Sequence, residues 1–345
     1  MRKIDIDSVV RNNIVKLKPY SCARSEYKGK EAIFLDANEN PYDNGYNRYP
    51  DPLQLDLKKE ISKIKNIDIN QIFLGNGSDE AIDLIFRIFC NPSKDNMVTI
   101  YPSYGMYQVC ADINDIETRK ALLNDDFTLN IENIFSNIDE NTKLVFLCSP
   151  NNPTGNSLTK EDIQYILNKF NGIVVVDEAY FDFSSYISAL DYLNEYNNLI
   201  VLQTFSKAWG MAGIRLGMAF ADSRIIHYFN KVKPPYNVNA ITQKVALEKI
   251  NNIEQKNDYV KIINEEKIKL MNEIAKLSYI KRVYDSDANY FLAKLDDPKK
   301  LYKYLVEKSI VVRDRSDIEL LEGCLRITVG TVVENIELLK ILKEY

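Results

Sequence analysis

Between about residues 70 and 220, short apolar runs alternate with longer amphipathic runs, and this alternation limits the fold more than any other feature of the sequence. The apolar runs are IFLG, MVTIY, KLVFLC, GIVVVD, LIVLQT and LGMAFA. Continuous runs of β-branched residues, such as 173–176, are typical of strands buried on both faces. Their alternation with helices predicts an α/β fold with a mainly parallel sheet, whose ligands bind at the carboxyl ends of the strands.

The pattern changes after KPPYNVN (233–239). Helical stretches are expected over 240–250 and 254–277, followed by the strand-like runs NYFLAKL, IVVRDR and CLRITVG and a final helix over 332–343. This order predicts a smaller α+β domain, with Pro234 and Pro235 as the hinge. A chain of 345 residues is long enough for one large and one small domain.

Composition excludes several classes of function. The 44 basic and 49 acidic residues give a net charge of −5 and are scattered along the chain, so neither nucleic acid nor an anionic membrane surface is an expected partner. The N-terminus lacks the apolar core of a signal peptide, and no run of about 18 apolar residues could span a bilayer. We therefore expect a cytoplasmic protein.

Cysteine and histidine usage narrows the chemistry further. The five cysteines are widely spaced without a C-x-x-C pair, which indicates reduced, buried thiols rather than disulfides or zinc ligands; they are Cys22, Cys90, Cys110, Cys148 and Cys324. The single histidine, His227, lies in an amphipathic helical pattern typical of a structural side chain. No metal site is predicted, and proton transfer is left to lysine, tyrosine or carboxylates.

Four polar motifs each follow a predicted strand, so they should meet at one edge of the sheet. They are GNGSDEAI (75–82), SPNNPTGN (149–156), VVVDEAY (174–180) and TFSKAWGMAGIR (204–215). The first lacks the third glycine of a dinucleotide fingerprint and the lysine of a Walker motif. It suits a helix N-terminus whose free N–H groups and Ser78 hydroxyl bind one phosphate, although an ordinary capped helix has the same pattern. Ser206 and Arg215 would add donors for the same anion.

Asp177 and Lys207 are the candidate reactive groups. Asp177 ends an apolar strand, where a buried carboxylate needs a cation or a strong donor such as a protonated ring nitrogen; a helix-capping aspartate is the alternative. Lys207 lies in a turn of small residues, where partial desolvation would lower its pKa and give a nucleophilic amine; a solvated loop lysine is the alternative.

Together these motifs resemble the fold-type I pyridoxal-phosphate aminotransferases and, more narrowly, the histidinol-phosphate aminotransferases. The resemblance covers nearly the whole chain and rests on LKPYSCAR (17–24), LDANENPY (35–42), RYPDP (48–52), GNGSDEAI, YPSYGMY (101–107), SPNNPTG, VVDEAYFDF (175–183), SKAWGMAGIRLG (206–217) and GCLRITVG (323–330). It implies a seven-stranded, mainly parallel sheet between helices in the large domain. It also implies a division into an N-terminal arm (1–35) that joins the small domain and the dimer interface, a large domain (36–235) and a small domain (236–345).

The resemblance also implies a role for each cofactor-binding residue. Lys207 would form the Schiff base with pyridoxal 5'-phosphate and later shuttle the proton, while Asp177 would keep the pyridine nitrogen protonated. Tyr104 would stack on the ring, and Asn152 and Tyr180 would bind its phenolate oxygen. The cofactor phosphate would be held by Gly77, Ser78, Asp79, Ser206 and Arg215, and by Tyr49 from the neighbouring subunit of a homodimer with shared sites.

The implied reaction is ping-pong transfer of an amino group between L-histidinol phosphate and 2-oxoglutarate in histidine biosynthesis, giving imidazole acetol phosphate and glutamate. One arginine site must then accept either a phosphate or a carboxylate. Arg326 with Arg313, Tyr20 and Asn152 would form it, and Arg315 is a second candidate beside Arg313.

Three other functions share these motifs in part. An aromatic amino acid aminotransferase, or a pyridoxal-phosphate lyase such as threonine-phosphate decarboxylase, would use the same cofactor residues. The ligand-sensing domain of a transcription regulator would need a DNA-binding module, for which the 30-odd residues before AIFLDAN leave no room.

Overall fold

The structure is a computed structural model that describes residues 3–20, 27 and 32–345. Cys22 lies outside the described residues. The other four cysteines are free thiols. They are buried because the apolar runs that contain them form strands and helices of the core. No helix in the described part of the chain is both long enough and apolar enough to cross a membrane.

The larger unit is built on a seven-stranded sheet, as expected, with the order β1-β7-β6-β5-β4-β2-β3. The strands are β1 (Ile72–Asn76), β2 (Asn96–Tyr101), β3 (Glu117–Leu122), β4 (Thr142–Cys148), β5 (Ile173–Asp177), β6 (Leu199–Thr204) and β7 (Leu216–Ala221). Only β7 runs against its neighbours, so the other six strands end at the same edge. The first four residues of β5 are fully buried, which explains their continuous β-branched sequence.

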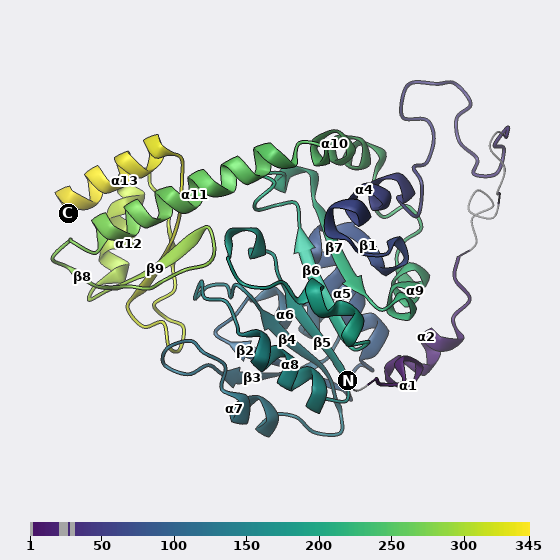
Figure 1. Ribbon diagram of the computed structural model, residues 1–345, viewed down its shortest axis with the longest axis horizontal. Coiled ribbons are helices and arrows are strands. Elements are labelled where there is room, and N and C mark those ends of the chain that lie inside the picture. Colours follow the sequence, from purple (N-terminus) through teal and green to yellow (C-terminus); the bar gives the residue numbers. More distant parts are fainter. Residues whose placement is uncertain (1–2, 21–26, 28–31) are drawn as a thin grey trace.

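Helices cover both faces of this sheet (Figure 1). Alternate strand residues point into two separate apolar clusters, one on each face. One cluster is closed by α1 (Ile6–Val9), α2 (Asn12–Lys16), α5 (Gly77–Phe89), α6 (Met106–Ile113) and α9 (Ser223–Val232). The other is closed by α4 (Leu55–Lys65), α7 (Ile131–Ser136), α8 (Lys160–Lys169) and α10 (Ala240–Ile250). Single-turn 3-10 segments occupy Ile69–Gln71, Phe181–Phe183 and Ala212–Ile214, and a longer one occupies Ala189–Glu195.

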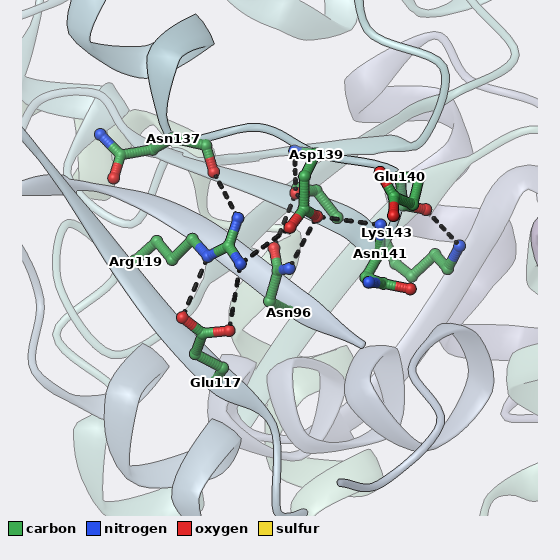
Figure 2. A network of polar contacts seen from close by, with 9 residues as sticks. Asn96, Glu117, Arg119, Asn137, Asp139, Glu140, Asn141 and Lys143 are labelled. Carbon is green, nitrogen blue, oxygen red and sulfur yellow. Dashed lines mark hydrogen bonds and ion pairs between the residues drawn. The ribbon is translucent and has the colours of Figure 1, made fainter. Parts of the chain in front are cut away.

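The edge strand β3 has no apolar run and was not expected from the sequence. It pairs only with β2, and most of its side chains are at least partly exposed, so its sequence ETRKAL stays polar. Arg119 of β3 bridges Glu117 and Asp139, and Asp139 also accepts a hydrogen bond from Asn96 at the start of β2 (Figure 2). This polar network ties together the starts of β2, β3 and β4, at the edge of the sheet opposite the carboxyl ends.

The smaller unit has a four-stranded antiparallel sheet of order β10-β11-β9-β8. Its elements are α11 (Ile253–Ile274), β8 (Ile280–Val283), β9 (Tyr290–Leu295), α12 (Pro298–Glu307), β10 (Arg313–Asp314), β11 (Cys324–Thr328) and α13 (Val332–Glu344). Strand β10 covers only two residues of the predicted strand IVVRDR. The strand is shorter because the Ile310 N–H donates a hydrogen bond to the Leu305 carbonyl in α12 and does not pair within the sheet. The long α11 runs from the large unit across the small sheet (Figure 1).

The division into domains at residues 35 and 235 stays a prediction. Two segments that this division separates from the large domain, the N-terminal arm and α10, pack against the core of the large unit. The N-terminal arm packs against α5 and α9, where Ile6 and Ile14 join the large-unit core and Asp7 accepts a hydrogen bond from Tyr228 at 2.7 Å. Helix α10 also belongs to the large-unit core through Ala246 and Ile250. The change in composition at Pro234 marks a change in secondary structure, whereas the change in packing comes near the start of α11.

Candidate active site

A cavity lies where the carboxyl ends of β1, β4, β5 and β6 meet, which is where the four polar motifs were expected to converge. It is lined by Gly77, Ser78, Asp79, Tyr104, Cys148, Asn152, Asp177, Ala179, Tyr180, Thr204, Ser206, Lys207, Ala212 and Arg215. Ten of the predicted cofactor-binding residues are therefore brought to one place by the parallel strands.

The first turn of α5 forms one end of this cavity. Gly77 has φ +72° and its N–H donates to the Arg215 carbonyl at 2.8 Å, so the helix begins directly against the start of β7. A Cβ on Gly77 would lie 2.7 Å from the Arg215 guanidinium, which explains the glycine. The free N–H groups of this 13-residue helix point toward the cavity, where they favour an anion.

Arg215 and two serines complete an anion-binding corner beside this helix end. Arg215 itself has φ +54°, an uncommon backbone conformation for a non-glycine residue, and its guanidinium lies 3.3 Å from the Asp79 carboxylate. The Ser206 hydroxyl is 3.0 Å from that of Thr204, and the Ser78 side chain lines the same space. One cation, hydroxyl groups and free amides at a helix N-terminus are the donor set that a phosphate requires.

Asp177 is the buried carboxylate at the end of β5, with 2 % of its surface exposed. It accepts hydrogen bonds from the Tyr107 hydroxyl at 2.8 Å and from the Ala179 N–H at 3.0 Å, and no cation among the described residues forms an ion pair with it. Burial is the largest influence on this group and raises the pKa of Asp177 to about 6. A cation that entered the cavity would therefore be stabilised strongly by Asp177.

The neighbouring carboxylate, Glu178, points away from the cavity. It accepts hydrogen bonds from Ser188, Gln203 and the Ala189 N–H, and burial raises its pKa to about 7. These contacts hold the loop after β5 in place. Two adjacent carboxylates thus have different environments because the strand sends their side chains to opposite faces.

Lys207 lies across the cavity from Asp177. Burial, and next the positive charge of Arg326, lower the pKa of the Lys207 ammonium. Its Nζ is 5.6 Å from the centre of the Tyr180 ring. A lysine held this way has a larger neutral fraction than a solvated lysine, so it can act as a nucleophile and as a base.

Three aromatic or amide side chains form the remaining walls. The Tyr180 hydroxyl is 3.4 Å from the Asn152 amide nitrogen, and burial raises the Tyr180 pKa above its ordinary value. Tyr104 donates to Asp79 at 3.2 Å and meets the Tyr107 ring edge-on. The Tyr104 ring is thus held beside the anion-binding corner.

The small unit contributes Arg326 from β11. The guanidinium donates to Asn152 Oδ1 at 2.5 Å and lies over the Tyr290 ring at 5.1 Å from its centre. Arg313 on β10 is paired with Arg326 in the ladder, as expected, but its side chain is exposed. Arg313 lines a second groove together with Tyr302, residues 309–312 and Arg326 itself, so Arg326 stands between this groove and the cavity.

Besides Arg313, the predicted residues Tyr49 and Tyr20 are not at the cavity in this single chain. Tyr49 stacks on Tyr236 with ring centres 4.4 Å apart and lines a second cavity with residues 37–39 and 46–50. Tyr20 is 76 % exposed. Residues that reach the site and were missed are Tyr107, Cys148, Thr204 and Tyr290. Tyr107 follows Tyr104 by three residues in YPSYGMY and lies in the first turn of α6, and this short spacing is the signal that could have pointed to Tyr107.

Comparison with known proteins agrees with this geometry. A sequence model of the family described as aminotransferase class I and II matches residues 25–342. This chain belongs to that family. The aminotransferase is 56 % identical over 341 residues to a histidinol-phosphate aminotransferase of Bacteroides thetaiotaomicron, with 99 % of both chains covered.

Solved structures show the same fold. The aminotransferase superposes on the histidinol-phosphate aminotransferase of Clostridium acetobutylicum with a TM-score of 0.79 and 25 % identity, covering 86 % of this chain and 90 % of the other. A histidinol-phosphate aminotransferase of Sinorhizobium meliloti, solved in complex with pyridoxal-5'-phosphate, gives a TM-score of 0.78 at 20 % identity, with 86 % and 83 % covered.

The cavity of this aminotransferase has the groups that pyridoxal phosphate requires. The α5 N-terminus with Arg215 suits its phosphate, and the buried Asp177, which lacks a cation, suits a protonated ring nitrogen. The Lys207 amine, with its lowered pKa, suits an aldehyde. These three groups line one cavity, so the donor set fits the cofactor.

Proposed function

We propose that this aminotransferase transfers the amino group of L-histidinol phosphate to 2-oxoglutarate, giving imidazole acetol phosphate and glutamate, with pyridoxal 5'-phosphate as its cofactor. The observation that carries the proposal is one cavity that combines the Lys207 amine, the buried Asp177 carboxylate and an anion-binding helix end. The relatives that share the chain's full length at about half identity support the choice of substrate. These relatives do not favour the aromatic aminotransferase or lyase alternatives.

The cofactor, when bound, supplies an aldehyde that takes up the amino group and a ring that accepts the electron pair released at the substrate carbon. Ser78, Ser206 and Arg215 would hold its phosphate with the N–H groups of residues 78 and 79, since the Gly77 N–H is already bonded to the Arg215 carbonyl. Asp177 would hold the proton at the ring nitrogen, and the hydrogen bond from Tyr107 keeps the carboxylate oriented for this role. Tyr104 bounds the ring.

Lys207 has two tasks in this proposal. Its neutral amine would hold the cofactor at its aldehyde group, and when free it would move the proton of the substrate carbon. Burial lowers its pKa and so keeps the amine available for the second task. Tyr180 and Asn152, which line the cavity beside Lys207, would donate to the oxygen of the cofactor ring and so orient the ring toward Lys207.

Both amino donors carry an anionic group: histidinol phosphate has a phosphate ester on the carbon next to the reacting carbon, and glutamate has two carboxylates. Arg326 binds that group in both cases, because it is already held at the cavity by Asn152 and Tyr290. Asn152 thus contacts cofactor and substrate. Arg313 or its neighbour Arg315 supplies a second cation, and Tyr20 reaches the same group from the N-terminal arm.

The functional assembly is a homodimer with shared active sites. Tyr49 lies outside the cavity of its own chain, in a surface formed by residues 37–50 and 236–241 that includes a wide apolar hollow. In the dimer it donates to the cofactor phosphate of the other subunit. The enzyme works in the cytoplasm without nucleic acid, consistent with its reduced cysteines and its scattered charge.

The test is a panel of amino donors with 2-oxoglutarate as acceptor, with glutamate measured as product. We expect L-histidinol phosphate to give the highest kcat/KM, at least about tenfold above phenylalanine and tyrosine, since loss of one charge-assisted contact alone accounts for that factor. Phenylalanine or tyrosine as the best donor would contradict the proposal. So would release of carbon dioxide from threonine phosphate without glutamate.

A further inference from the structure

A further pocket lies at the opposite end of β1 from the active-site cavity, between α4, α9 and the 3-10 turn Ile69–Gln71. These elements lie together beside β1, the edge strand of the large sheet (Figure 1). The pocket has a volume of about 350 Å³, within the range of about 300–1,000 Å³ that is typical of small-molecule sites. It shares no lining residue with the active-site cavity or with the hollows at Tyr49 and Arg313.

Lys58 of α4 lies at the bottom of this pocket, with 4 % of its surface exposed. Its ammonium forms no hydrogen bond or ion pair with any described residue of the chain. Two other lysines are buried to a similar degree, but both have acceptors. Lys233 donates to the Pro235 carbonyl at 2.8 Å, and Lys267 donates to the Ala288 carbonyl at 2.7 Å. A buried ammonium without an acceptor is unfavourable, so Lys58 is available to pair with an anion from outside the chain.

The charges around Lys58 also favour an anion. Burial, followed by the positive charge of Lys233, lowers the pKa of the Lys58 ammonium to about 8, so most of it is still charged at neutral pH. The charge of Asp51 acts on Lys58 without forming an ion pair. The Asp51 carboxylate instead accepts the Leu53 and Leu55 N–H groups at 2.8 Å and 2.6 Å. No carboxylate side chain is among the described residues that line the pocket, so its floor has an uncompensated positive charge.

The other lining groups suit a ligand that is anionic at one end and apolar at the other. Hydrogen-bonding side chains stand around Lys58, namely Asn70, Ser223, His227 and Asn230. The amide oxygen of Asn230 is buried and accepts no hydrogen bond from the described residues. The rest of the wall is aliphatic and consists of Leu53, Leu55, Ile69 and Ile226. An inorganic anion would leave this aliphatic wall in contact with water, whereas an organic acid would cover it.

We propose that this pocket binds a small organic acid, whose carboxylate pairs with the Lys58 ammonium and whose hydrocarbon part packs against the aliphatic wall. One lysine supplies one positive charge, which a single carboxylate balances. The site is separate from the active-site cavity, so the proposal does not depend on the identity of the amino donor. The cost of keeping Lys58 buried without a partner is offset only when the acid is bound.

His227 is a reporter for this pocket, because it lines the pocket and is the single histidine of the chain. The experiment titrates 3-methylbutanoate into histidine-labelled holoenzyme without a histidine tag and follows the NMR signal of the His227 ring. We expect a saturable shift, and binding at least about tenfold weaker for the neutral 3-methylbutanamide, the factor for one lost charge-assisted contact. Inorganic phosphate, which cannot cover the aliphatic wall, should also bind more weakly. The absorbance of the cofactor reports separately on binding in the active-site cavity.

Lys58→Met removes the charge and keeps an apolar side chain. Binding of 3-methylbutanoate to this variant should be at least about tenfold weaker. The midpoint of urea unfolding without ligand should not fall, because the substitution breaks no contact of the ammonium and removes an unpaired buried charge. Lys267→Met is the matched control. It loses the bond to the Ala288 carbonyl, so its urea midpoint should fall while the His227 titration stays unchanged.

The inference would be overturned by the absence of a saturable shift, or by equal affinity of the unaltered enzyme for the acid and its amide. That comparison needs no variant, so it holds even if a substitution prevents folding. Equal affinity for inorganic phosphate would overturn the assignment to an organic acid. A urea midpoint that falls as far in Lys58→Met as in Lys267→Met would show that Lys58 pairs within the assembled protein, for example with a second copy of the chain, and would also overturn the inference.

Discussion

Burial, more than contact with a charge, sets the chemistry of the individual site residues. Burial raises the pKa of Asp177 to about 6, although the hydrogen bonds from Tyr107 and the Ala179 N–H act in the opposite direction. The same burial lowers the pKa of Lys207 across the cavity. The two groups are therefore prepared for a ligand that brings a positive charge to Asp177 and an electrophile to Lys207.

Tyr107→Phe tests this account of Asp177. Loss of the hydroxyl leaves one carboxylate oxygen without its 2.8 Å donor, which raises the Asp177 pKa further. Asp177 would then be protonated more often and would stabilise a protonated cofactor ring less. We expect kcat to fall about 10-fold or more, since a hydrogen bond to a charged group is worth about 1.5–3 kcal/mol. The absorbance spectrum of the bound cofactor should also change its pH dependence.

Tyr192→Phe is the matched control for that variant. Its hydroxyl is equally buried but has no hydrogen-bond partner and lies away from the cavity. This substitution should leave activity and spectrum unchanged. Equal effects of the two substitutions would show that Tyr107 acts only through packing.

Sequence reasoning found most of the candidate site because each residue follows a strand at fixed spacing within a short motif. Tyr107 was missed because its role depends on how α6 packs over β5, which no local pattern encodes. Arg313 and Arg315 could not be separated, since residues two apart on a strand share one face. They differ in the structure, where Arg313 is exposed and Arg315 is half-buried, and burial of this kind depends on long-range packing.

At the scale of elements, the close approach of β7 to the start of α5 shapes the anion-binding corner. Gly217 has no room for a side chain, because a Cβ there would lie 2.2 Å from the Gly77 carbonyl carbon and from the Ser78 nitrogen. The two elements are also joined by the bond from the Gly77 N–H to the Arg215 carbonyl. The helix N-terminus is thus positioned by a strand that comes much later in the sequence.

Gly217→Ala should separate β7 from α5 and misplace the phosphate donors. We expect the cofactor dissociation constant to rise at least about 10-fold, with a loss of about 1–3 kcal/mol in the free energy of unfolding from overpacking. Gly213→Ala is the control, because that position has open space around it and an ordinary φ; its unfolding free energy should change by less than about 0.5 kcal/mol. Cofactor titration and urea unfolding measure both effects. Unchanged cofactor affinity in Gly217→Ala would contradict this role of the close approach.

Most elements of the fold were predictable, and the exceptions share a cause. The buried strands have continuous apolar sequences, so β1, β2 and β4 to β7 were all expected. The edge strand β3 is polar because one side faces solvent, and β10 is short because its preceding residues pack on α12. The pattern of apolar residues along a sequence indicates which elements are buried, so prediction from this pattern fails for strands that are only partly buried.

At the scale of the whole molecule, the active site depends on two units and, as we propose, on two subunits. The bond from Arg326 to Asn152 links the small sheet to the cavity of the large one. The sequence could not show that α10 and the N-terminal arm pack with the large unit. An amphipathic pattern indicates which face of a helix is buried, but it does not indicate which element covers that face. The position of Tyr49 outside its own cavity suits a residue that serves a neighbouring subunit.

Mixed dimers of Tyr49→Phe and Lys207→Ala subunits test the shared site. If Tyr49 reaches the other subunit, each mixed dimer has one site with both defects and one intact site. At limiting cofactor, purified mixed dimers should then be more active per Lys207 than Tyr49→Phe homodimers. Equal activity per Lys207 would indicate that each chain forms its site alone.

The central claim is that Lys207 is the group to which the cofactor attaches. The most direct measurement is borohydride reduction of the protein with pyridoxal phosphate, followed by digestion and mass spectrometry to locate the label. The account predicts that the label lies on Lys207, and that the Lys207→Ala protein carries none while remaining folded. Lys256 of α11 is a nearby lysine that should stay unlabelled. It lies over the ring of Trp209, which is on the same loop as Lys207, and it forms an ion pair with Asp182. A label on Lys256, or a label that persists in Lys207→Ala, would contradict the account.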